Sequence, residues 1–361
     1  MFSVPGVVFS NGERWRQLRR FTLSTLRNFG MGKRSIEERI QEEAQCLVQE
    51  LHKTHGMPFD PIFILSRAVS NVICSIVFGN RFDYDDVQFL QLNKLITKRF
   101  RVSSSPQATL YNMFPEFLEK LPGVHHAASK CSQKIISFIV ERIKMQEASR
   151  DPSAPQNFID CFLAKIEQEK HDPNTEFTME NLIMNTFNIF FAGTETVSTT
   201  LRYGFLLLLK HPEIQEKVHE EIDRVIGQDR IPNAEDRNKM PYTDAVLHEI
   251  QRFSDPFKWK NTRLDQLVGG KDGLREPKDY VSQSTSPSIS TGSTAFGFSL
   301  AGKRVCLGEG LARMELFLFL TTILQSFALT SPVPLSELNL APAVSATSRM
   351  PTKYQLLMVP R

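Results

Sequence analysis

The sequence has few cysteines for its length, and they form neither a disulfide pattern nor a zinc-binding pattern. Five cysteines are spread through 361 residues, at Cys46, Cys74, Cys131, Cys161 and Cys306. Their odd number, their wide spacing and the lack of any CxxC pair argue against a disulfide framework and a structural zinc site. Reduced thiols in a compartment that faces the cytosol fit better.

The sequence also lacks long apolar runs and a strong charge bias. No stretch reaches about 18 consecutive apolar residues, so we expect no membrane-spanning helix in the chain as given. The first residues, MFSVPGVVFSNGERW, lack the basic start and apolar core of a signal peptide. The formal net charge of +3 is small for this length, and we therefore expect no nucleic-acid partner.

Strand patterns are scarce before the stretch YQLLMV at 354–359, whereas helical patterns are frequent. Apolar spacing, caps and prolines predict helices at 12–26, 36–51, 61–78, 87–100, 115–121, 125–146, 178–210, 212–227, 242–253 and 311–327. The longest of them is normally buried along much of its length. We therefore expect a mainly α fold, with a single domain over residues 1–361.

The stretch 256–295 differs in composition from the rest of the chain. It has little periodicity, two adjacent glycines and a run rich in Ser and Thr from Ser282 to Thr294. This composition predicts an irregular or disordered insert.

The segment GKRVCLGEG, residues 302–310, surrounds Cys306 with residues that suit a reactive sulfur. Gly302 and Gly308 allow tight backbone turns, and Arg304 supplies a cation two residues before the cysteine. The helix expected just beyond offers unpaired N–H groups to a negative sulfur. An arbitrary cysteine is more often a small buried hydrophobe, but these neighbours favour a thiolate that binds a metal.

The segment FFAGTETVSTT, residues 190–200, places polar groups in the middle of the longest expected helix. Gly193 lets another group approach the backbone, and Glu195 with Thr196 could pass protons. The alternative is a kinked helix in which Thr196 bonds to a carbonyl one turn earlier.

Two residue pairs complete the set of candidate functional residues. Glu249 and Arg252 stand three apart on one helix face, a spacing that is more often an isolated surface ion pair. Trp15 and Arg19 lie one turn apart and could bind a carboxylate together. On their own, such pairs more often mark a helix face that packs on a core.

In combination these stretches resemble the cytochromes P450, the heme-thiolate monooxygenases, and in particular the mammalian microsomal, drug-metabolising family-two type. GKRVCLGEG matches the family's cysteine signature and AGTET its oxygen-activating helix signature. Glu249-x-x-Arg252 matches its buried ion pair, and Trp15-x-x-x-Arg19 its contact with the heme propionates. The four stretches occur in the family's order.

The resemblance implies a cytochrome P450 fold with heme b (iron protoporphyrin IX) as cofactor and Cys306 as the axial ligand of the iron. The residues that it places around the cofactor are Trp15, Arg19, Ala192, Gly193, Arg304, Cys306 and Gly308. Of these, Ala192 and Gly193 would leave room for dioxygen. Thr196, helped by Glu195, would deliver protons, and Glu249 with Arg252 would support the scaffold behind the cysteine.

The activity implied by the resemblance is insertion of one oxygen atom into a small lipophilic substrate, such as a xenobiotic, a fatty acid or a steroid. Electrons would come from NADPH through NADPH–cytochrome P450 reductase, with cytochrome b5 as a further partner. The basic residues Arg14, Arg16, Arg20, Lys33 and Arg34 suit the docking of an acidic partner. The location implied is the cytosolic face of the endoplasmic reticulum membrane, recovered as microsomes.

The sequence departs from the family's pattern in three places. The chain begins just before the Trp15 helix, so the family's N-terminal anchor, its first helices and most of its main β-sheet have no counterpart. Residues 256–295 show no resemblance, and either Arg263 or Arg275 could be the third member of the ion-pair network. One residue is added between Phe298 and Gly302.

These departures predict an N-terminally truncated and incomplete cytochrome P450 fold, altered between residues 256 and 295. They also leave two alternatives open. One is a catalytically inactive relative that does not bind heme productively. The other is a helical interaction protein whose motifs are inherited remnants.

Overall fold

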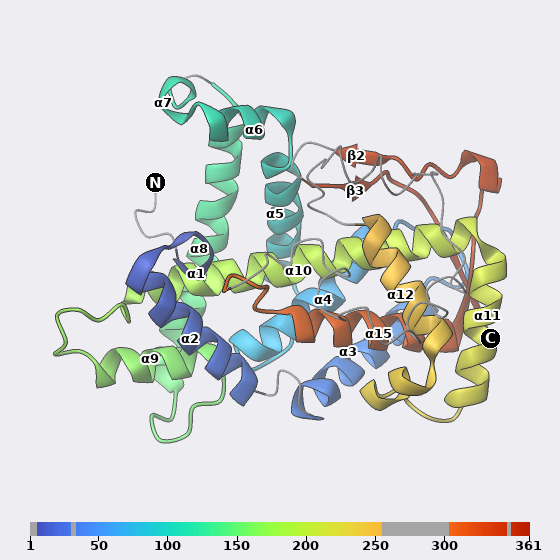
Figure 1. Cartoon of the computed structure of the whole chain (residues 1–361), viewed down its shortest axis with the longest axis horizontal. Coiled ribbons are helices and arrows are strands. Elements are labelled where there is room, and N and C mark those ends of the chain that lie inside the picture. Colours follow the sequence, from blue (N-terminus) through green and yellow to red (C-terminus); the bar gives the residue numbers. More distant parts are fainter. Residues whose placement is uncertain (1–5, 30–33, 121, 255–302, 345–347) are drawn as a thin grey trace, which may run out of the picture. The chain divides into compact units, whose positions relative to one another are not determined.

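The computed structural model of the chain describes residues 6–29, 34–120, 122–254, 303–344 and 348–361. Within these ranges the fold is mainly helical, as the sequence predicts (Figure 1). Contacts divide the chain into two compact units that alternate along the sequence. The first holds Met1–Glu43, Ser66–Ser103 and Leu110–Thr196; the second holds Ala44–Leu65, Ser104–Thr109 and Val197–Arg361. The expected insert at 256–295 lies outside the described residues.

The first unit is built from helices. They are α1 (Gly6–Phe9), α2 (Gly12–Asn28), α5 (Val87–Ser103), α7 (Pro115–Leu118), α8 (Val124–Ser149) and α9 (Phe158–Gln168). Four more continue from one unit into the other: α3 (Arg34–His52), α4 (Ile62–Val77), α6 (Pro106–Met113) and α10 (Met179–Lys210). Helices α5 and α8 pack side by side (Figure 1). The sequence predicted these helices with the exception of α1, α6 and α9.

Aromatic side chains hold α9 in place although its sequence did not predict a helix. Phe21 of α2 makes edge-to-face contacts with Phe158, Phe162 and Phe177, with ring centroids 5.9, 5.1 and 5.1 Å apart. The side chain of Asn157 caps α9 by accepting a hydrogen bond of 3.0 Å from the backbone N–H three residues on. Burial of two phenylalanines and a good cap therefore fix this short helix.

The second unit contains the remaining helices and all four strands assigned in the described ranges. Its helices are α11 (Pro212–Val225), α12 (Pro241–Ser254) and α15 (Glu309–Ser326), with 3-10 turns at Ala234–Lys239 and Leu335–Glu337. Its strands are β1 (Phe327–Thr330), β2 (Pro342–Val344), β3 (Met350–Pro351) and β4 (Leu357–Pro360). β1 pairs antiparallel with β4, and β2 with β3. The sequence predicted only the last strand.

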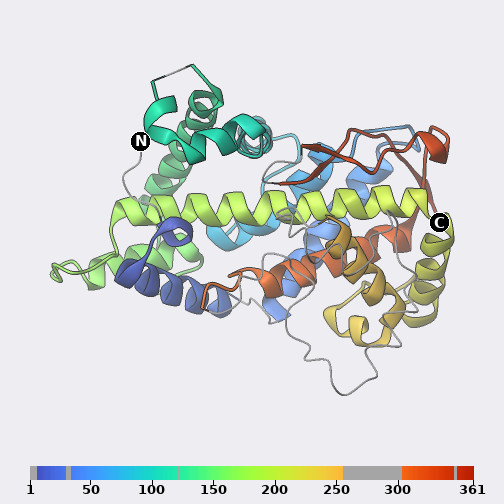
Figure 2. The same ribbon diagram turned by 45° about the horizontal axis from the view of Figure 1, so that its top comes forward.

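Helix α15 is the buried centre of the second unit and carries the cysteine loop at its N-terminal end. It contacts both α11 and α12, and the three helices lie side by side in both views (Figures 1 and 2). The side-chain amide of Gln325 donates to the carbonyls of Gly227 and Arg230, at 2.6 and 2.8 Å. The loop before α15 is therefore attached to a helix that is firmly held.

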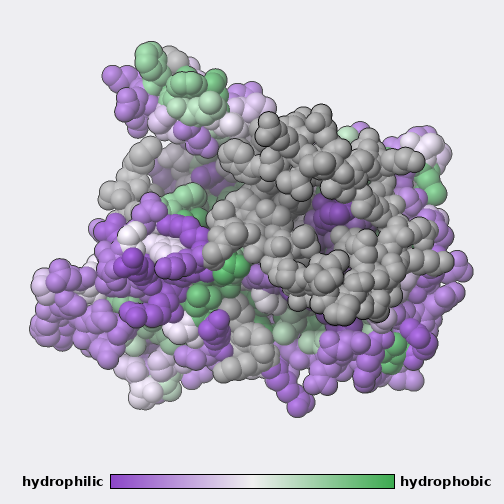
Figure 3. Space-filling model, in the orientation of Figure 1, coloured by the Kyte–Doolittle hydropathy of each residue, from purple (hydrophilic) through white to green (hydrophobic). Residues whose placement is uncertain are grey.

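An apolar patch is exposed on α6 and α7, where Figure 3 shows green surface at the top of the view. Its side chains are Leu110, Met113, Phe114 and Phe117, exposed by 50%, 66%, 53% and 86%.

Among the described helices, none is both long enough and apolar enough to cross a membrane.

Candidate functional site

The cysteine loop leads directly into α15, with Gly308 as the residue that caps the helix. Cys306 is exposed and Arg304 is half-buried, whereas Gly302 lies outside the described residues. The backbone N–H of Ala312 donates to the carbonyl of Gly308 over 2.9 Å, which closes the first turn. The sulfur thus stands just before the N-terminal end of a buried helix, where backbone N–H groups favour negative charge.

Gly308 lies in a turn directly before α15, as the sequence indicates. Its φ of −100° is open to any residue, so this turn does not require a glycine. Among the described residues, nothing lies within 4 Å of a Cβ added at Gly308 or at Gly310. The described part of the chain therefore leaves space for another group beside the cysteine loop.

Glu249 and Arg252 form a two-pronged ion pair on α12. The guanidinium donates from Nε to Oε2 over 2.6 Å and from Nη2 to Oε1 over 2.5 Å. Glu249 is only 1% exposed. The pair is therefore not an isolated surface pair, and a buried carboxylate held in this way serves the scaffold. The possible third partners, Arg263 and Arg275, lie outside the described residues.

The acid and the alcohol of the AGTET segment lie in α10 and have different partners. The hydroxyl of Thr196 donates to the carbonyl of Ala192 over 2.7 Å, which is the back-bonded geometry that the sequence left as an alternative. Helix α10 nonetheless continues unbroken from Met179 to Lys210. Glu195 is 1% exposed and accepts a hydrogen bond from the hydroxyl of Thr97 in α5, at 2.6 Å.

Sequence reasoning missed Thr97 as a neighbour of Glu195. The two residues are 98 positions apart, and a threonine in an amphipathic helix carries no local signal of such a contact. Only the packing of α5 against α10 brings the hydroxyl to the carboxylate.

Gly193 and Ala192 differ in what surrounds them. A Cβ at Gly193 would lie 2.5 Å from Cδ1 of Ile73 in α4, so this glycine is where α4 approaches α10 closely. Ala192, one position earlier, is exposed. The space beside α10 that a ligand could use is therefore next to Ala192, whereas the space at Gly193 is filled by Ile73.

Trp15 and Arg19 are in contact with each other on α2. The guanidinium carbon of Arg19 lies 5.6 Å from the centre of the Trp15 ring, within the range of a cation–π contact. Both side chains are half-buried, while Leu18 on the same helix is completely buried. The indole N–H and the guanidinium are therefore held together as donors for an anionic group.

Three of the basic residues expected to dock a partner are already in ion pairs. Arg14 pairs with Glu176 at 2.7 Å, and Arg16 with Glu13 at 2.9 Å. Arg34 pairs with Glu38 at 3.4 Å. Arg20 is exposed, and Lys33 lies outside the described residues.

Glu315 is a buried acid of α15 that sequence reasoning did not identify. It is 1% exposed, and its Oε1 has no hydrogen-bond partner among the described residues. Burial raises the pKa of Glu315 well above its ordinary value. Burial therefore favours the neutral form of this carboxyl in the folded protein.

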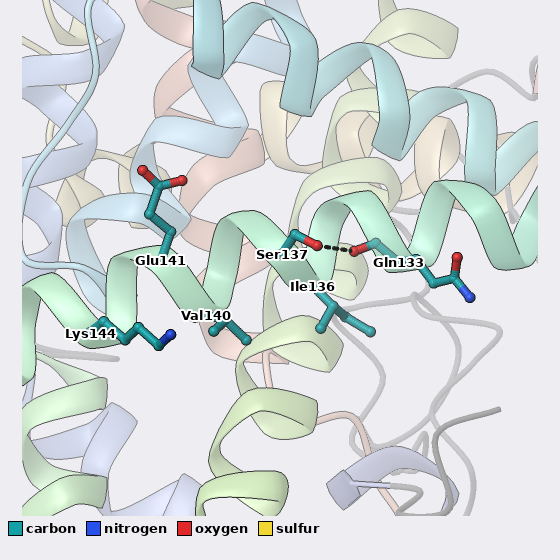
Figure 4. Close-up of a pocket in the computed structure, with 6 residues that line it drawn as sticks. All are labelled: Gln133, Ile136, Ser137, Val140, Glu141 and Lys144. Carbon is teal, nitrogen blue, oxygen red and sulfur yellow. Dashed lines mark hydrogen bonds between the residues drawn. The ribbon is translucent and has the colours of Figure 1, made fainter.

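A hollow of about 440 Å³ lies along α8 (Figure 4). It is lined by Gln133, Ile136, Ser137, Val140, Glu141 and Lys144. The hydroxyl of Ser137 donates to the carbonyl of Gln133 over 3.0 Å, so it is engaged within the helix. All lining residues belong to one helix, and a hollow without a second wall does not enclose a ligand.

The donor groups fit a heme-thiolate cofactor. Within the described ranges, no group of three or more His, Cys, Asp and Glu side chains is placed to hold an ion by itself. Cys306 instead offers a single exposed sulfur, with open space at Gly308 beside it. A thiolate ligand with a cationic donor for a carboxylate two positions earlier, Arg304, is the donor chemistry that a heme requires.

Comparison with known proteins assigns the family. The family model "Cytochrome P450" matches residues 1–265 and 282–358. Cytochrome P450 2G1 of Rattus norvegicus is 50% identical over 384 residues, which cover 100% of this chain and 78% of the relative. Cytochrome P450 2A13 of Homo sapiens is 47% identical over 388 residues, with the same coverage of 100% and 78%.

The family match also corrects the extent of the unlike stretch. We expected no resemblance from 256 to 295, but the match leaves out only residues 266–281 in the interior of the chain. Both flanks of the expected insert therefore carry the family's pattern. On its motifs, its helical fold and these matches, the chain belongs to the cytochrome P450 family, in its family-two branch, and is a cytochrome P450 monooxygenase by homology.

Proposed function

We propose that the chain binds heme b through Cys306 and inserts one atom of dioxygen into a small lipophilic substrate. The observation that carries the proposal is the exposed Cys306 sulfur before the N-terminus of α15, with open space at Gly308. When bound, heme supplies the iron at which dioxygen is reduced and activated. The residues of the chain bind that group, position it and supply protons.

Each unit, taken by itself, holds residues that we propose bind the heme. In the second unit, Cys306 is the ligand, and the half-buried Arg304 offers a cation to a propionate. The buried pair of Glu249 and Arg252 stiffens α12, which packs on α15. In the first unit, Trp15 and Arg19 offer an indole N–H and a guanidinium to a carboxylate.

Thr196 and Glu195 supply the proton route. The Thr196 hydroxyl donates to the carbonyl of Ala192, so its oxygen still has lone pairs that can accept a hydrogen bond. Ala192 is exposed on the same helix face, which leaves water room to approach that hydroxyl. Glu195 holds a carboxyl one residue away, and we propose that it exchanges protons with this route.

Aromatic side chains pack along the middle of α10. Phe187 and Phe191 stack at 6.0 Å on α10, and Phe100 of α5 lies 5.9 Å from Phe191. Phe100 and Phe187 are buried, so these rings belong to the packing of the helix. We therefore propose the substrate class, a small lipophilic molecule, from membership of the family. Xenobiotics, fatty acids and steroids all meet this description.

The partner that supplies electrons is NADPH–cytochrome P450 reductase, with cytochrome b5 as a second donor. The exposed Arg20 on α2 suits an acidic partner. For location we propose the cytosolic face of the endoplasmic reticulum membrane. The apolar patch of Leu110, Met113, Phe114 and Phe117 supports contact with a lipid surface.

Oxygen labelling tests the proposed reaction. The full chain is reconstituted with heme, reductase and NADPH, and dodecanoic acid is supplied under ¹⁸O₂. The proposal predicts a hydroxylated product that carries a single ¹⁸O atom, and less product per NADPH in the Thr196→Val variant. Heme-loaded protein that forms no labelled product would show that the chain is an inactive relative.

A further inference from the structure

The acid of the AGTET segment is held by a hydroxyl from another helix. The Thr97 hydroxyl of α5 donates to Oε1 of Glu195 in α10, and the two oxygens are 2.6 Å apart. Thr97 is 5% exposed and Glu195 is 1% exposed. A short O–H···O contact between buried groups is typical of a hydrogen bond to an ionised carboxylate.

This hydrogen bond belongs to a larger contact between the two helices. Phe191 and Glu195 are four residues apart and share one face of α10, while Thr97 and Phe100 are three apart on α5. Phe100 contacts Phe191 with ring centroids 5.9 Å apart. The Thr97 hydroxyl is therefore fixed in position by aromatic packing one turn away.

Arg99 is a charged residue of α5 that contacts α10 at Phe191. Its guanidinium lies 5.7 Å from the centre of the Phe191 ring and donates to the hydroxyl of Ser132 in α8 over 2.9 Å. From α4, the contact with this part of α10 is the apolar side chain of Ile73 at Gly193. The hydrogen bond that α5 makes to the Glu195 carboxylate comes from Thr97.

Glu195 and Thr196 point in different directions although they are neighbours. Successive side chains on an α-helix are about 100° apart. Thr196 bonds back to Ala192 on the exposed side of α10, whereas Glu195 faces Thr97. The hydroxyl of Thr97 in α5 therefore holds the carboxylate on a different side of α10 from the Thr196 hydroxyl.

We propose that Thr97 is a positioning residue for Glu195: its hydroxyl holds the carboxylate turned toward α5 and sets how readily that carboxylate takes up a proton. The role rests on the proposed proton route. A donor to the charged form of a carboxyl favours that form, so loss of the hydroxyl makes Glu195 easier to protonate. In the exchange, a proton from water binds to a Glu195 oxygen and is later released; no other bond changes.

The direct test measures the titration of Glu195 in the full chain. Glutamate labelled with ¹³C at the carboxyl carbon is incorporated, and the Glu195 resonance is identified by its absence in Glu195→Gln. Thr97→Val removes the hydroxyl and keeps the shape. The proposal predicts that the pKa of Glu195 rises by about one to two units, the range expected for a charge-assisted hydrogen bond.

Two further variants separate positioning from a general loss of structure. Thr97→Ser keeps the hydroxyl and should restore the original titration. Thr186→Val is the matched control, because Thr186 is completely buried in the same helix and its hydroxyl has no partner among the described residues. An unchanged Glu195 titration in Thr97→Val, or a shift in Thr97→Ser as large as that in Thr97→Val, overturns the proposal.

A second measurement relates the titration to the reaction. In the reconstituted holoenzyme, the product formed per NADPH is recorded against pH. Its midpoint should move to higher pH in Thr97→Val by the same amount as the Glu195 titration. If the titration moves and the midpoint does not, Thr97 positions Glu195, but the assignment of Glu195 to the proton route fails.

Discussion

Arg252 donates two hydrogen bonds to Glu249, one turn earlier on α12, and the carboxylate that it neutralises is 1% exposed. A charge with so little contact to water is costly to bury unless it is paired and hydrogen-bonded. Loss of the ion pair should therefore destabilise α12, and with it α15, which α12 contacts.

Removing one partner of this pair should destabilise the protein. Arg252→Gln removes the two hydrogen bonds and the positive charge that this guanidinium brings to the buried Glu249 carboxylate. We expect a loss of about 2 to 3 kcal/mol in the free energy of unfolding, somewhat less than for a fully buried pair because the Arg252 side chain is 36% exposed. Urea unfolding measures the loss. Arg16→Gln, which breaks an exposed pair with Glu13, is the control and should have little effect; equal losses would contradict the account.

The effect of a substitution at Gly193 on the free energy of unfolding should depend on the residue at position 73. In a helix, Gly→Ala gains about 1 kcal/mol, but overpacking costs about 1 to 3 kcal/mol. Because a Cβ at Gly193 would lie 2.5 Å from Ile73, we expect Gly193→Ala to be destabilising by up to about 2 kcal/mol. In an Ile73→Ala background the same change should become stabilising. A double-mutant cycle that shows no coupling would rule out this contact as the reason for the glycine.

Glu315 should make stability depend on pH. Its pKa is raised in the folded state by burial, from an ordinary value of 4.5. The folded protein therefore binds more protons than the unfolded chain above about pH 4.5, and stability falls as the pH rises toward the folded-state pKa. Glu315→Gln replaces the carboxyl with an amide that does not ionise, so this variant should not show the loss of stability with rising pH.

Thermal unfolding at a series of pH values measures the effect. The melting temperature of Glu315→Gln should exceed that of the unmodified chain at pH 8, and the difference should shrink as the pH approaches 4.5. Glu216→Gln changes an exposed glutamate of α11 and serves as the control. A constant difference at all pH values would contradict the role of the Glu315 titration.

The apolar patch on α6 and α7 should bind lipid. Burial of one phenylalanine side chain contributes about 1.5 to 3 kcal/mol, so Phe114→Ser with Phe117→Ser should weaken binding to neutral phosphatidylcholine vesicles at least about tenfold. Co-sedimentation with the vesicles measures it. Val87→Ser is the control, since Val87 is 66% exposed on α5, outside the patch. Equal binding by the patch variant and the control would remove the patch as a lipid contact.

The helices with strong periodicity could be predicted from the sequence because their apolar spacing is local. Helix α10 was expected at 178–210 and is found at Met179–Lys210. Helix α9 was missed because its stability comes from Phe158 and Phe162 packing on Phe21, a contact between distant segments. The strands β2 and β3 were missed because three and two residues are too few to show an alternating pattern. Strand β1 was missed because it begins at Phe327, directly after α15, where the apolar pattern of the helix continues without a break.

The candidate site also contains some residues that could be predicted from the sequence and others that could not. The motif around Cys306, the pair of Glu249 and Arg252 and the pair of Trp15 and Arg19 are readable because their residues lie within a few positions of one another. The neighbours supplied by other helices, Thr97 at Glu195 and Ile73 at Gly193, are visible only in the structure.

The proposed role of Cys306 as the thiolate ligand of a heme has an optical signature. It is read from the absorption difference spectrum of the heme-loaded, reduced chain with and without carbon monoxide. We expect a Soret band at the position typical of thiolate ligation, retained in the control Cys161→Ser and lost in Cys306→Ser. Absence of that band in the unmodified chain, or its persistence in Cys306→Ser, would show that Cys306 is not the ligand.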